Sequence, residues 1–260
     1  MGKPIVFIHG AWLTPASWDK FQGRFAARGY DVEAPAWPYE NIPLTELRRN
    51  PPAALAGVGI TEIVDHYDRI IRAKSPQPVI LGHSFGGLFT QLLLDRGLGT
   101  AGVGIDAAPI KGVMPGLVSV IGALPVLLSW NAWKTMHTIS FSSFFRDFAN
   151  GLPEADARAA YEKYVAPIPG KLFFDEVLNK GNAVDPTRRK VPLLLTAGGK
   201  DRTVTAGSVR GVYARQKASS AITGLKFYPD RSHFLCAMPG WEQVADFVLG
   251  WLDNPKAGEL

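Results

Sequence analysis

Cysteine is scarce in this sequence, with Cys236 the single example among 260 residues. One cysteine cannot form a disulfide within the chain, so a disulfide-rich scaffold is excluded and nothing requires an oxidising compartment. A secretory signal pattern is also missing from the start, MGKPIVFIHG, because its apolar run is short and no small-residue cleavage site follows. We therefore expect the chain to begin with a strand and to be cytoplasmic.

Concentrated charge is missing as well. Lysine and arginine together number 28 and aspartate and glutamate 23, which gives a net charge of +5. The basic residues are scattered, and their two short clusters, residues 48–49 and 188–190, contain no interleaved aromatic residues. A spread surface charge of this kind gives no basis for a nucleic-acid partner.

Long apolar runs are limited to one candidate, residues 112–130, GVMPGLVSVIGALPVLLSW. This segment has no charge and approaches the length that a membrane-spanning helix needs. It also contains Pro115 and Pro125, and proline inside a helix breaks or kinks it. We expect buried or pocket-covering helices here and no membrane span.

The remaining composition, 47% hydrophobic, is enough to bury a sizeable core in one domain with an insertion. Strand-like runs alternate with amphipathic helical patterns, which is typical of an α/β fold with a mostly parallel sheet of about six strands flanked by helices. The expected strands are residues 4–10, 31–38, 78–84, 101–109, 191–199 and 222–230. The clearest expected helices are residues 17–30, 61–74, 85–97 and 241–252.

The alternation stops between the fourth and fifth expected strands. There the chain is helical in pattern and rich in phenylalanine, leucine and proline, as in FSSFFRDFAN and KLFFDEVL. This predicts a helical cap, or lid, over residues 111–186, inserted into a core made of residues 1–110 and 187–260.

The stretch VILGHSFGG, residues 79–87, places a serine between glycines where a strand meets a helix. G-x-S-x-G in this context predicts a nucleophile elbow, a tight turn that exposes the hydroxyl of Ser84 above the sheet. The glycines permit close backbone approach, and the helix that follows directs its positive dipole end at the site.

A serine nucleophile needs a base and a carboxylate that orients it. His233 is the last histidine and follows the last strand, which fits the chain order Ser, Asp, His of this type of site. Asp201 follows the fifth strand, so it lies at the same sheet edge as His233. Asp106, after the fourth strand, is the alternative, but the loop of Asp201 leads more directly towards the histidine.

An oxyanion hole requires two main-chain N–H groups beside the nucleophile. One is expected from Phe85, the residue after the serine, and the other from the loop after the first strand. In that loop, FIHGAW, Gly10 permits the turn and Ala11 is the expected donor.

Four motifs, HGAW at 9–12, GHSFGG at 82–87, GKD at 199–201 and SHF at 232–234, together resemble the α/β-hydrolase superfamily, in particular its capped serine esterases. The sequence is similar to bacterial carboxylesterases and to the plant methyl-esterase and hydroxynitrile-lyase group. The resemblance implies a catalytic triad of Ser84, Asp201 and His233 and an oxyanion hole of Ala11 and Phe85. The sequence shows no ligand cluster of His, Cys, Asp and Glu and no dinucleotide-binding motif after the first strand, so we expect neither metal nor cofactor. One departure from the family pattern is visible: the family often opens with a strand hairpin before the HG strand, whereas this chain begins almost at HG, so we expect a sheet shorter by two strands.

The expected activity is hydrolysis of carboxylic esters with small to medium apolar or aromatic groups, through an acyl-enzyme, by a monomer or homodimer. The alternatives are hydroxynitrile-lyase-like or other non-ester chemistry on the same residues, for which a pocket lysine such as Lys134 or Lys200 is the cue, and a small-molecule receptor. The expected substrate pocket is lined by Trp12, His83, Phe141, Phe144, Phe145 and Phe234.

Overall fold

The computed structural model describes residues 2–260 and contains one large sheet. Its strands are β1 (Lys3–Ile8), β2 (Tyr30–Glu33), β3 (Val79–His83), β4 (Ala101–Ile105), β7 (Leu193–Gly198), β8 (Thr223–Tyr228) and β9 (Gly258–Glu259). Their spatial order is β2-β1-β3-β4-β7-β8-β9, and every neighbouring pair is parallel. This confirms the predicted α/β-hydrolase fold with its parallel sheet.

Burial explains why the central strands are recognisable in the sequence. Every residue of β3, β4 and β7 is buried, because helices cover both faces of the sheet, and these strands are correspondingly apolar. The structure adds a seventh strand, β9, to the six that were expected. That strand has two residues, GE, which are too few to show the alternating pattern that identifies a strand in a sequence.

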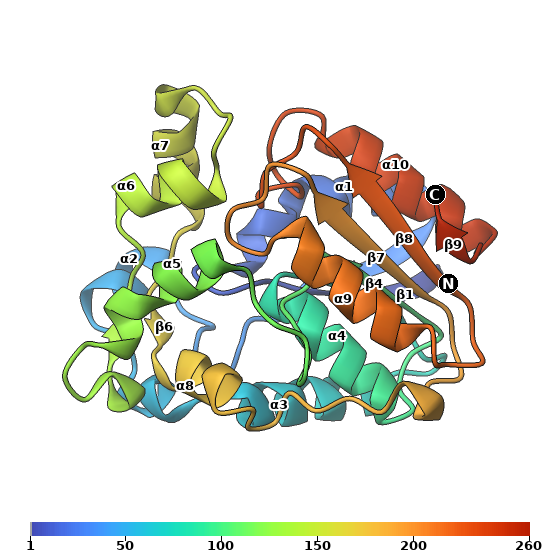
Figure 1. Cartoon of the computed structure of the whole chain (residues 1–260), viewed down its shortest axis with the longest axis horizontal. Helices are drawn as coiled ribbons and strands as arrows, with labels where there is room; N and C mark the ends of the chain where they lie inside the picture. Colours follow the sequence, from blue (N-terminus) through green and yellow to red (C-terminus); the bar gives the residue numbers. More distant parts are fainter. Residues whose placement is uncertain (1) are drawn as a thin grey trace.

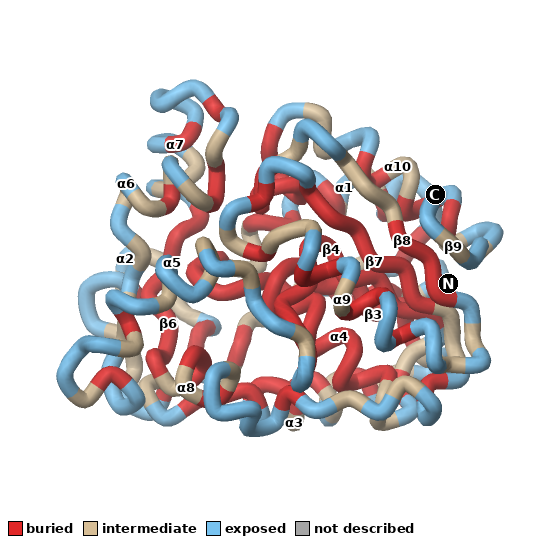
Figure 2. The backbone as a smooth tube through the Cα atoms, viewed as in Figure 1, coloured by how far each residue is buried: buried red, intermediate tan, exposed pale blue. Residues whose placement is uncertain are grey.

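Two layers of helices enclose the sheet (Figure 1). Helices α1 (Asp19–Ala26) and α10 (Trp241–Asp253) pack together on one face. Helices α3 (Ile60–Arg72), α4 (Phe85–Asp95) and α9 (Ala206–Gln216) cover the other face. Figure 2 shows the buried strands and α4 at the centre of the molecule. The sequence pattern missed α9, whose composition, AGSVRGVYARQ, has little amphipathic contrast.

Shorter helical turns complete this part of the chain. They lie in the connections between the larger elements and are η1 (Pro15–Trp18), α2 (Leu44–Arg49), η2 (Ala53–Gly57) and η5 (Pro186–Arg188).

The chain between β4 and β7 forms a separate group of elements beyond the carboxyl ends of the strands (Figure 1). Its helices are α5 (Leu117–Leu127), η3 (Ala132–Lys134), α6 (Phe141–Ser143), the π-helix η4 (Phe144–Phe148), α7 (Glu154–Tyr164) and α8 (Lys171–Val177). It also contains a small antiparallel sheet of β5 (Met136–His137) and β6 (Ile168–Pro169). The sequence pattern predicts helices here and does not indicate this sheet. The division of the chain into a core and a cap stays a prediction.

The uncharged segment 112–130 contains α5, which has 11 residues and includes Pro125. Within residues 2–260, no helix is both long and apolar enough to cross a membrane.

Candidate active site

Ser84 occupies the turn between β3 and α4 in a strained main-chain conformation. Its φ of 56° and ψ of −121° lie outside the regions that serine normally adopts. The surrounding main chain holds it there: the Ser84 N–H donates to the Ile105 carbonyl at 2.9 Å, and its carbonyl accepts from Gly87 and Ala108. Strain of this kind costs about 1–3 kcal/mol and persists where neighbouring structure fixes it, most often at functional sites.

Three glycines allow the turn to form against neighbouring main chain. A Cβ on Gly82 would overlap the carbonyl of Gly86, and a Cβ on Gly86 would overlap the carbonyl oxygen of Ile8. A Cβ on Gly10 would lie 2.7 Å from the Cβ of Ser84. The loop after β1 therefore packs directly against the serine, which requires glycine at these positions.

Replacement of Gly86 by alanine is expected to lower the free energy of unfolding by about 1–3 kcal/mol, since the Ile8 carbonyl is fixed in strand β1, which is paired on both sides within the sheet. The matched control is Gly250→Ala on helix α10, where nothing lies within 4 Å and a gain of about 0.5–1 kcal/mol is expected. Urea unfolding followed by circular dichroism measures both. Equal midpoints for Gly86→Ala and the wild type would contradict the close packing of β1 on α4.

His233 and Asp201 form a buried hydrogen-bonded pair. The Nδ1–H of His233 donates to Oδ2 of Asp201 at 2.6 Å, and both side chains are fully buried. The other carboxylate oxygen, Oδ1, accepts from the N–H groups of Thr203 and Val204, each at 2.7 Å. Among residues 2–260, the Nε2 atom of His233 has no hydrogen-bond partner. The arrangement fixes the imidazole tautomer and leaves Nε2 able to accept a proton.

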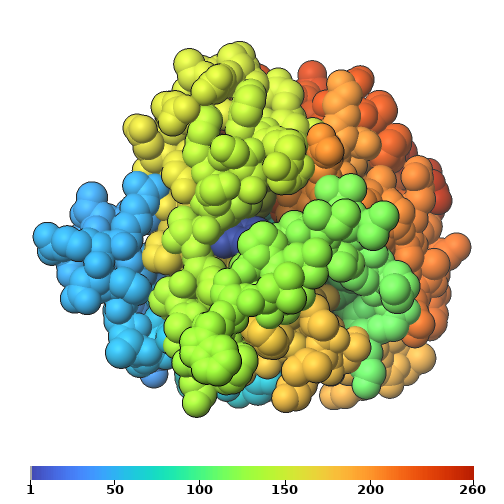
Figure 3. Space-filling view, turned by 60° about the vertical axis from the view of Figure 1, so that its left-hand side comes forward, coloured from blue at the N-terminus to red at the C-terminus, as the bar shows by residue number. Residues whose placement is uncertain are grey.

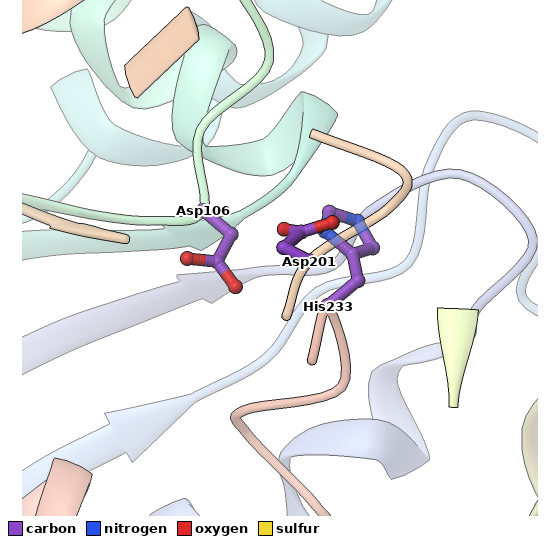
Figure 4. Close-up of side chains that lie close together, drawn as sticks. All are labelled: Asp106, Asp201 and His233. Carbon is purple, nitrogen blue, oxygen red and sulfur yellow. The ribbon is translucent and has the colours of Figure 1, made fainter. Parts of the chain in front are cut away.

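Asp106 lies on the far side of Asp201 from the histidine (Figure 4). Its Oδ1 accepts from the Gly198 N–H at 2.9 Å, and its Oδ2 has no hydrogen-bond partner in the part of the chain that the structure describes. Burial, and then the nearby negative charge of Asp201, raise the pKa of Asp106 well above its usual range. The structure therefore joins His233 to Asp201, and the environment of the alternative carboxyl, Asp106, favours its uncharged form.

The side chains of Asp106, Asp201 and His233 are also close enough to suggest a metal site, with one potential ligand atom of each within 4.8 Å of the others. Two ligands of one zinc ion, each bonded at about 2.0–2.2 Å, lie roughly 3 Å or more apart. The 2.6 Å between His233 Nδ1 and Asp201 Oδ2 is shorter and suits a shared proton. The geometry therefore favours a hydrogen bond between His233 and Asp201 over shared metal ligation.

The loop after β1 and the start of α4 contribute main-chain donors beside Ser84. Ala11 and Phe85 line the same cavity as the serine. Within residues 2–260, the main-chain hydrogen bonds of turns and loops use neither the N–H of Ala11 nor that of Phe85. Trp12 has a φ of 61°, and the Leu13 N–H donates to the Gly10 carbonyl at 3.3 Å, so the loop turns sharply at this point.

The cavity at Ser84 has a volume of about 140 Å³ and mostly apolar walls. Helix α5 contributes one wall of the cavity. This agrees with the expectation that the uncharged segment covers a pocket. Figure 3 shows the surface hollowed between parts of the green segment that follows β4, with the blue N-terminal part of the chain at the floor. Besides Ser84, the lining includes Ala11, Trp12, Phe85, Pro115, Val118, Ala123, Leu127, Phe148, Phe173, Glu176 and Arg202.

The predicted pocket lining needs correction, because Trp12 is the one member of that set found in the wall of the cavity. Phe144 and Phe234 are buried against each other, with ring centroids 5.9 Å apart, and Phe141 stacks on Phe145 at 6.0 Å. Three of these phenylalanines belong to the segment between β4 and β7, and Phe234 belongs to the loop of His233. Their contacts therefore pack the segment internally and against that loop.

His83 also lies outside the lining. Its Nε2–H donates to the carbonyl of His233 at 2.7 Å, and burial, followed by the nearby His233, lowers its pKa well below the usual range. A neutral His83 therefore positions the main chain of His233.

Phe148 was not anticipated in the site. Its ring meets the ring of His233 edge to face, with centroids 4.7 Å apart, and it lines the cavity. The residue sits on the π-helix η4, a turn whose register does not follow a 3.6-residue period. No periodic pattern in the sequence therefore distinguishes it from the phenylalanines around it.

A serine held at positive φ between a parallel strand and a helix, at the carboxyl edge of a sheet with this strand order, defines the α/β-hydrolase architecture. The family model described as "Alpha/beta hydrolase family" matches residues 5–247. The chain belongs to this family, as its four motifs predict.

Solved structures that are named as a methylesterase or as hydrolases share the fold. A methylesterase from Arabidopsis, MES16, has a TM-score of 0.70 at 15% identity, with 96% of this chain and 99% of that chain covered. A pyrethroid hydrolase from Sphingobium faniae has a TM-score of 0.66 at 17% identity, with 97% and 98% covered. An extracellular α/β-hydrolase from a Paenibacillus species has a TM-score of 0.65 at 19% identity, with 95% and 98% covered. Comparison with curated protein sequences gives no significant match.

Proposed function

We propose that this α/β-hydrolase is a serine esterase that cleaves carboxylic esters through an acyl-enzyme. The observation that carries the proposal is the buried His233–Asp201 hydrogen bond of 2.6 Å, which leaves Nε2 of the histidine without a partner. Ser84 lies in the same region, because the residue before it, His83, bonds to the His233 carbonyl at 2.7 Å. A nucleophile, a base and an orienting carboxylate are the three parts that this chemistry requires.

The proposed reaction begins when Oγ of Ser84 attacks the ester carbonyl carbon and its proton passes to Nε2 of His233. Negative charge then develops on the carbonyl oxygen, where the N–H groups of Ala11 and Phe85 stabilise it. His233 returns the proton to the leaving alcohol as the C–O bond breaks, and Ser84 remains acylated. A water molecule, deprotonated by the same histidine, attacks the acyl carbon and releases the acid and the free serine.

The walls of the cavity support a small apolar or aromatic ester as substrate. Trp12, Phe85 and Phe173 form one cluster in the lining, with Trp12 and Phe85 respectively 5.1 Å and 5.6 Å from Phe173 between ring centroids. Such surfaces favour apolar groups, with a few polar atoms to orient them. The names of the structural neighbours, a methylesterase and a pyrethroid hydrolase, support ester chemistry in this fold.

The lining supports a hydrolase over hydroxynitrile-lyase-like chemistry. Among residues 2–260 that line the cavity there is no lysine. Lys134 is exposed, and Lys200 forms an ion pair with Asp230 at 3.2 Å.

Trapping of the covalent intermediate tests the proposal. The purified protein is incubated with a p-nitrophenyl alkylphosphonate, digested and analysed by mass spectrometry, and in parallel assayed on p-nitrophenyl esters of increasing acyl length. We expect one phosphonyl adduct on Ser84 and turnover that declines once the acyl chain outgrows the cavity. A folded protein that forms no adduct on Ser84 and hydrolyses no ester contradicts the esterase proposal.

A further inference from the structure

Glu176 contributes a carboxyl group to the mostly apolar wall of the Ser84 cavity. It lies on α8, three residues after Phe173, and residues at this spacing share one face of a helix. Phe173 also lines the cavity and packs edge to face on Phe85, the neighbour of the serine, with centroids 5.6 Å apart. Glu176 therefore lies about one helical turn along the wall from the reacting end of the cavity.

This carboxyl group has no cation partner among the described residues. The other carboxylate in the lining, Asp147, is paired with Arg146 at 2.5 Å and with Arg202 at 3.5 Å. Glu176 instead accepts one hydrogen bond at Oε2, from Nδ2 of the buried Asn182 at 3.0 Å. Its second oxygen, Oε1, makes no hydrogen bond within residues 2–260 and is not among their fully buried unpaired atoms. One oxygen is thus fixed by the protein and the other is free for a ligand.

The elements around Glu176 leave its charge uncompensated. Helix α5, which packs against α8, contains no titratable residue. On α8 itself Lys171 is paired with Asp175 at 2.7 Å and with Glu62 of α3 at 3.1 Å, and the adjacent η3 carries the exposed Lys134. Burial raises the pKa of Glu176 to about 7, against the opposing effect of the Asn182 hydrogen bond.

We propose that Glu176 is a specificity-determining residue that binds a hydroxyl group on the ester substrate. A ligand that fills the cavity removes Oε1 from water, and a polar atom buried in this way without a partner is costly, so the site discriminates against ligands that cannot satisfy it. A hydroxyl donates to the ionised carboxylate and accepts from the protonated acid, so it satisfies Glu176 in both states. The inference rests on the proposed function for the reaction, and it narrows the substrates to hydroxy-substituted apolar or aromatic esters.

The test compares methyl phenylacetate with its ring-hydroxylated derivatives by chromatography of the acid product. We expect wild-type kcat/KM to favour the best hydroxylated ester by about tenfold or more, and Glu176→Leu to reduce this ratio to about one. The preference should increase from about pH 6 to pH 8, because hydrogen bonds to an ionised acceptor are stronger. Glu176→Gln should retain part of the preference without its pH dependence. The matched control, Glu162→Gln on the exposed side of α7, should behave as the wild type.

A binding titration separates this inference from the proposed function. Phenylacetamide and hydroxyphenylacetamides are titrated into Ser84→Ala protein, with and without Glu176→Leu, and followed by calorimetry. Tighter binding of a hydroxylated amide that disappears with Glu176→Leu supports the hydroxyl site, even if no ester is hydrolysed. Equal binding of both kinds of amide, no binding of either, or a preference that survives Glu176→Leu overturns it.

Discussion

Replacement of Ser84 by alanine is expected to lower kcat for p-nitrophenyl esters by about 10⁴- to 10⁶-fold. Ser84 is the one residue between the end of β3 and the start of α4. Removal of its hydroxyl leaves His233 with no nucleophile to activate. Donors at Ala11 and Phe85 remain, so a residual rate above that of water is expected. Initial rates at saturating ester, measured on separately purified protein, give the ratio.

The variant also needs to be folded for this comparison. Alanine at a φ of 56° is no more strained than serine, and the main-chain hydrogen bonds to Ile105 and from Gly87 do not involve the hydroxyl. Thermal unfolding of Ser84→Ala should therefore match that of the wild type closely. A folded variant that retains a tenth or more of wild-type kcat is incompatible with Ser84 as the nucleophile.

The sequence predicts the polar residues of the site because each follows a strand that is recognisable by itself. Ser84 follows β3, Asp201 follows β7 and His233 follows β8. Strands β7 and β8 are adjacent and parallel, with Leu193 opposite Thr223, so the loops after them leave the sheet at one edge. The short distance between Asp201 and His233 is thus a consequence of topology, and topology follows from the alternation of strands and helices.

The walls of the cavity depend on packing between segments that are distant in sequence. Local composition shows that residues 141–148 are rich in phenylalanine, but it does not show which rings face the cavity. Both Phe144 and Phe148 are buried, but Phe144 packs on Phe234 outside the cavity lining, whereas Phe148 lies against His233 in the wall. Glu176 could not be predicted for the same reason. Its position in the cavity wall depends on the packing of α8 against apolar elements and on the hydrogen bond from Asn182.

The second large expected effect is the loss of kcat on substitution of one of the two aspartates, Asp201 and Asp106, at the carboxyl edge of the sheet. Replacement of Asp201 by asparagine is expected to lower kcat by about 10⁴-fold. An asparagine amide that donates to Nδ1 of His233 moves the imidazole proton to Nε2, the atom that must accept the proton of Ser84. The geometry that supports this is the 2.6 Å contact between His233 Nδ1 and Asp201 Oδ2.

The same substitution at Asp106 is expected to reduce kcat by less than about tenfold, since burial and then the adjacent Asp201 raise the pKa of this carboxyl well above its usual range and favour its uncharged form. An asparagine oxygen can accept the Gly198 N–H that Asp106 accepts at 2.9 Å, so a neutral amide replaces a neutral acid with its main contact intact. Paired measurement of kcat for Asp201→Asn and Asp106→Asn decides between the two carboxylates. A larger loss at Asp106 would assign the orienting role to that residue, and comparable large losses at both would mean that the two carboxyl groups act as one coupled unit on His233.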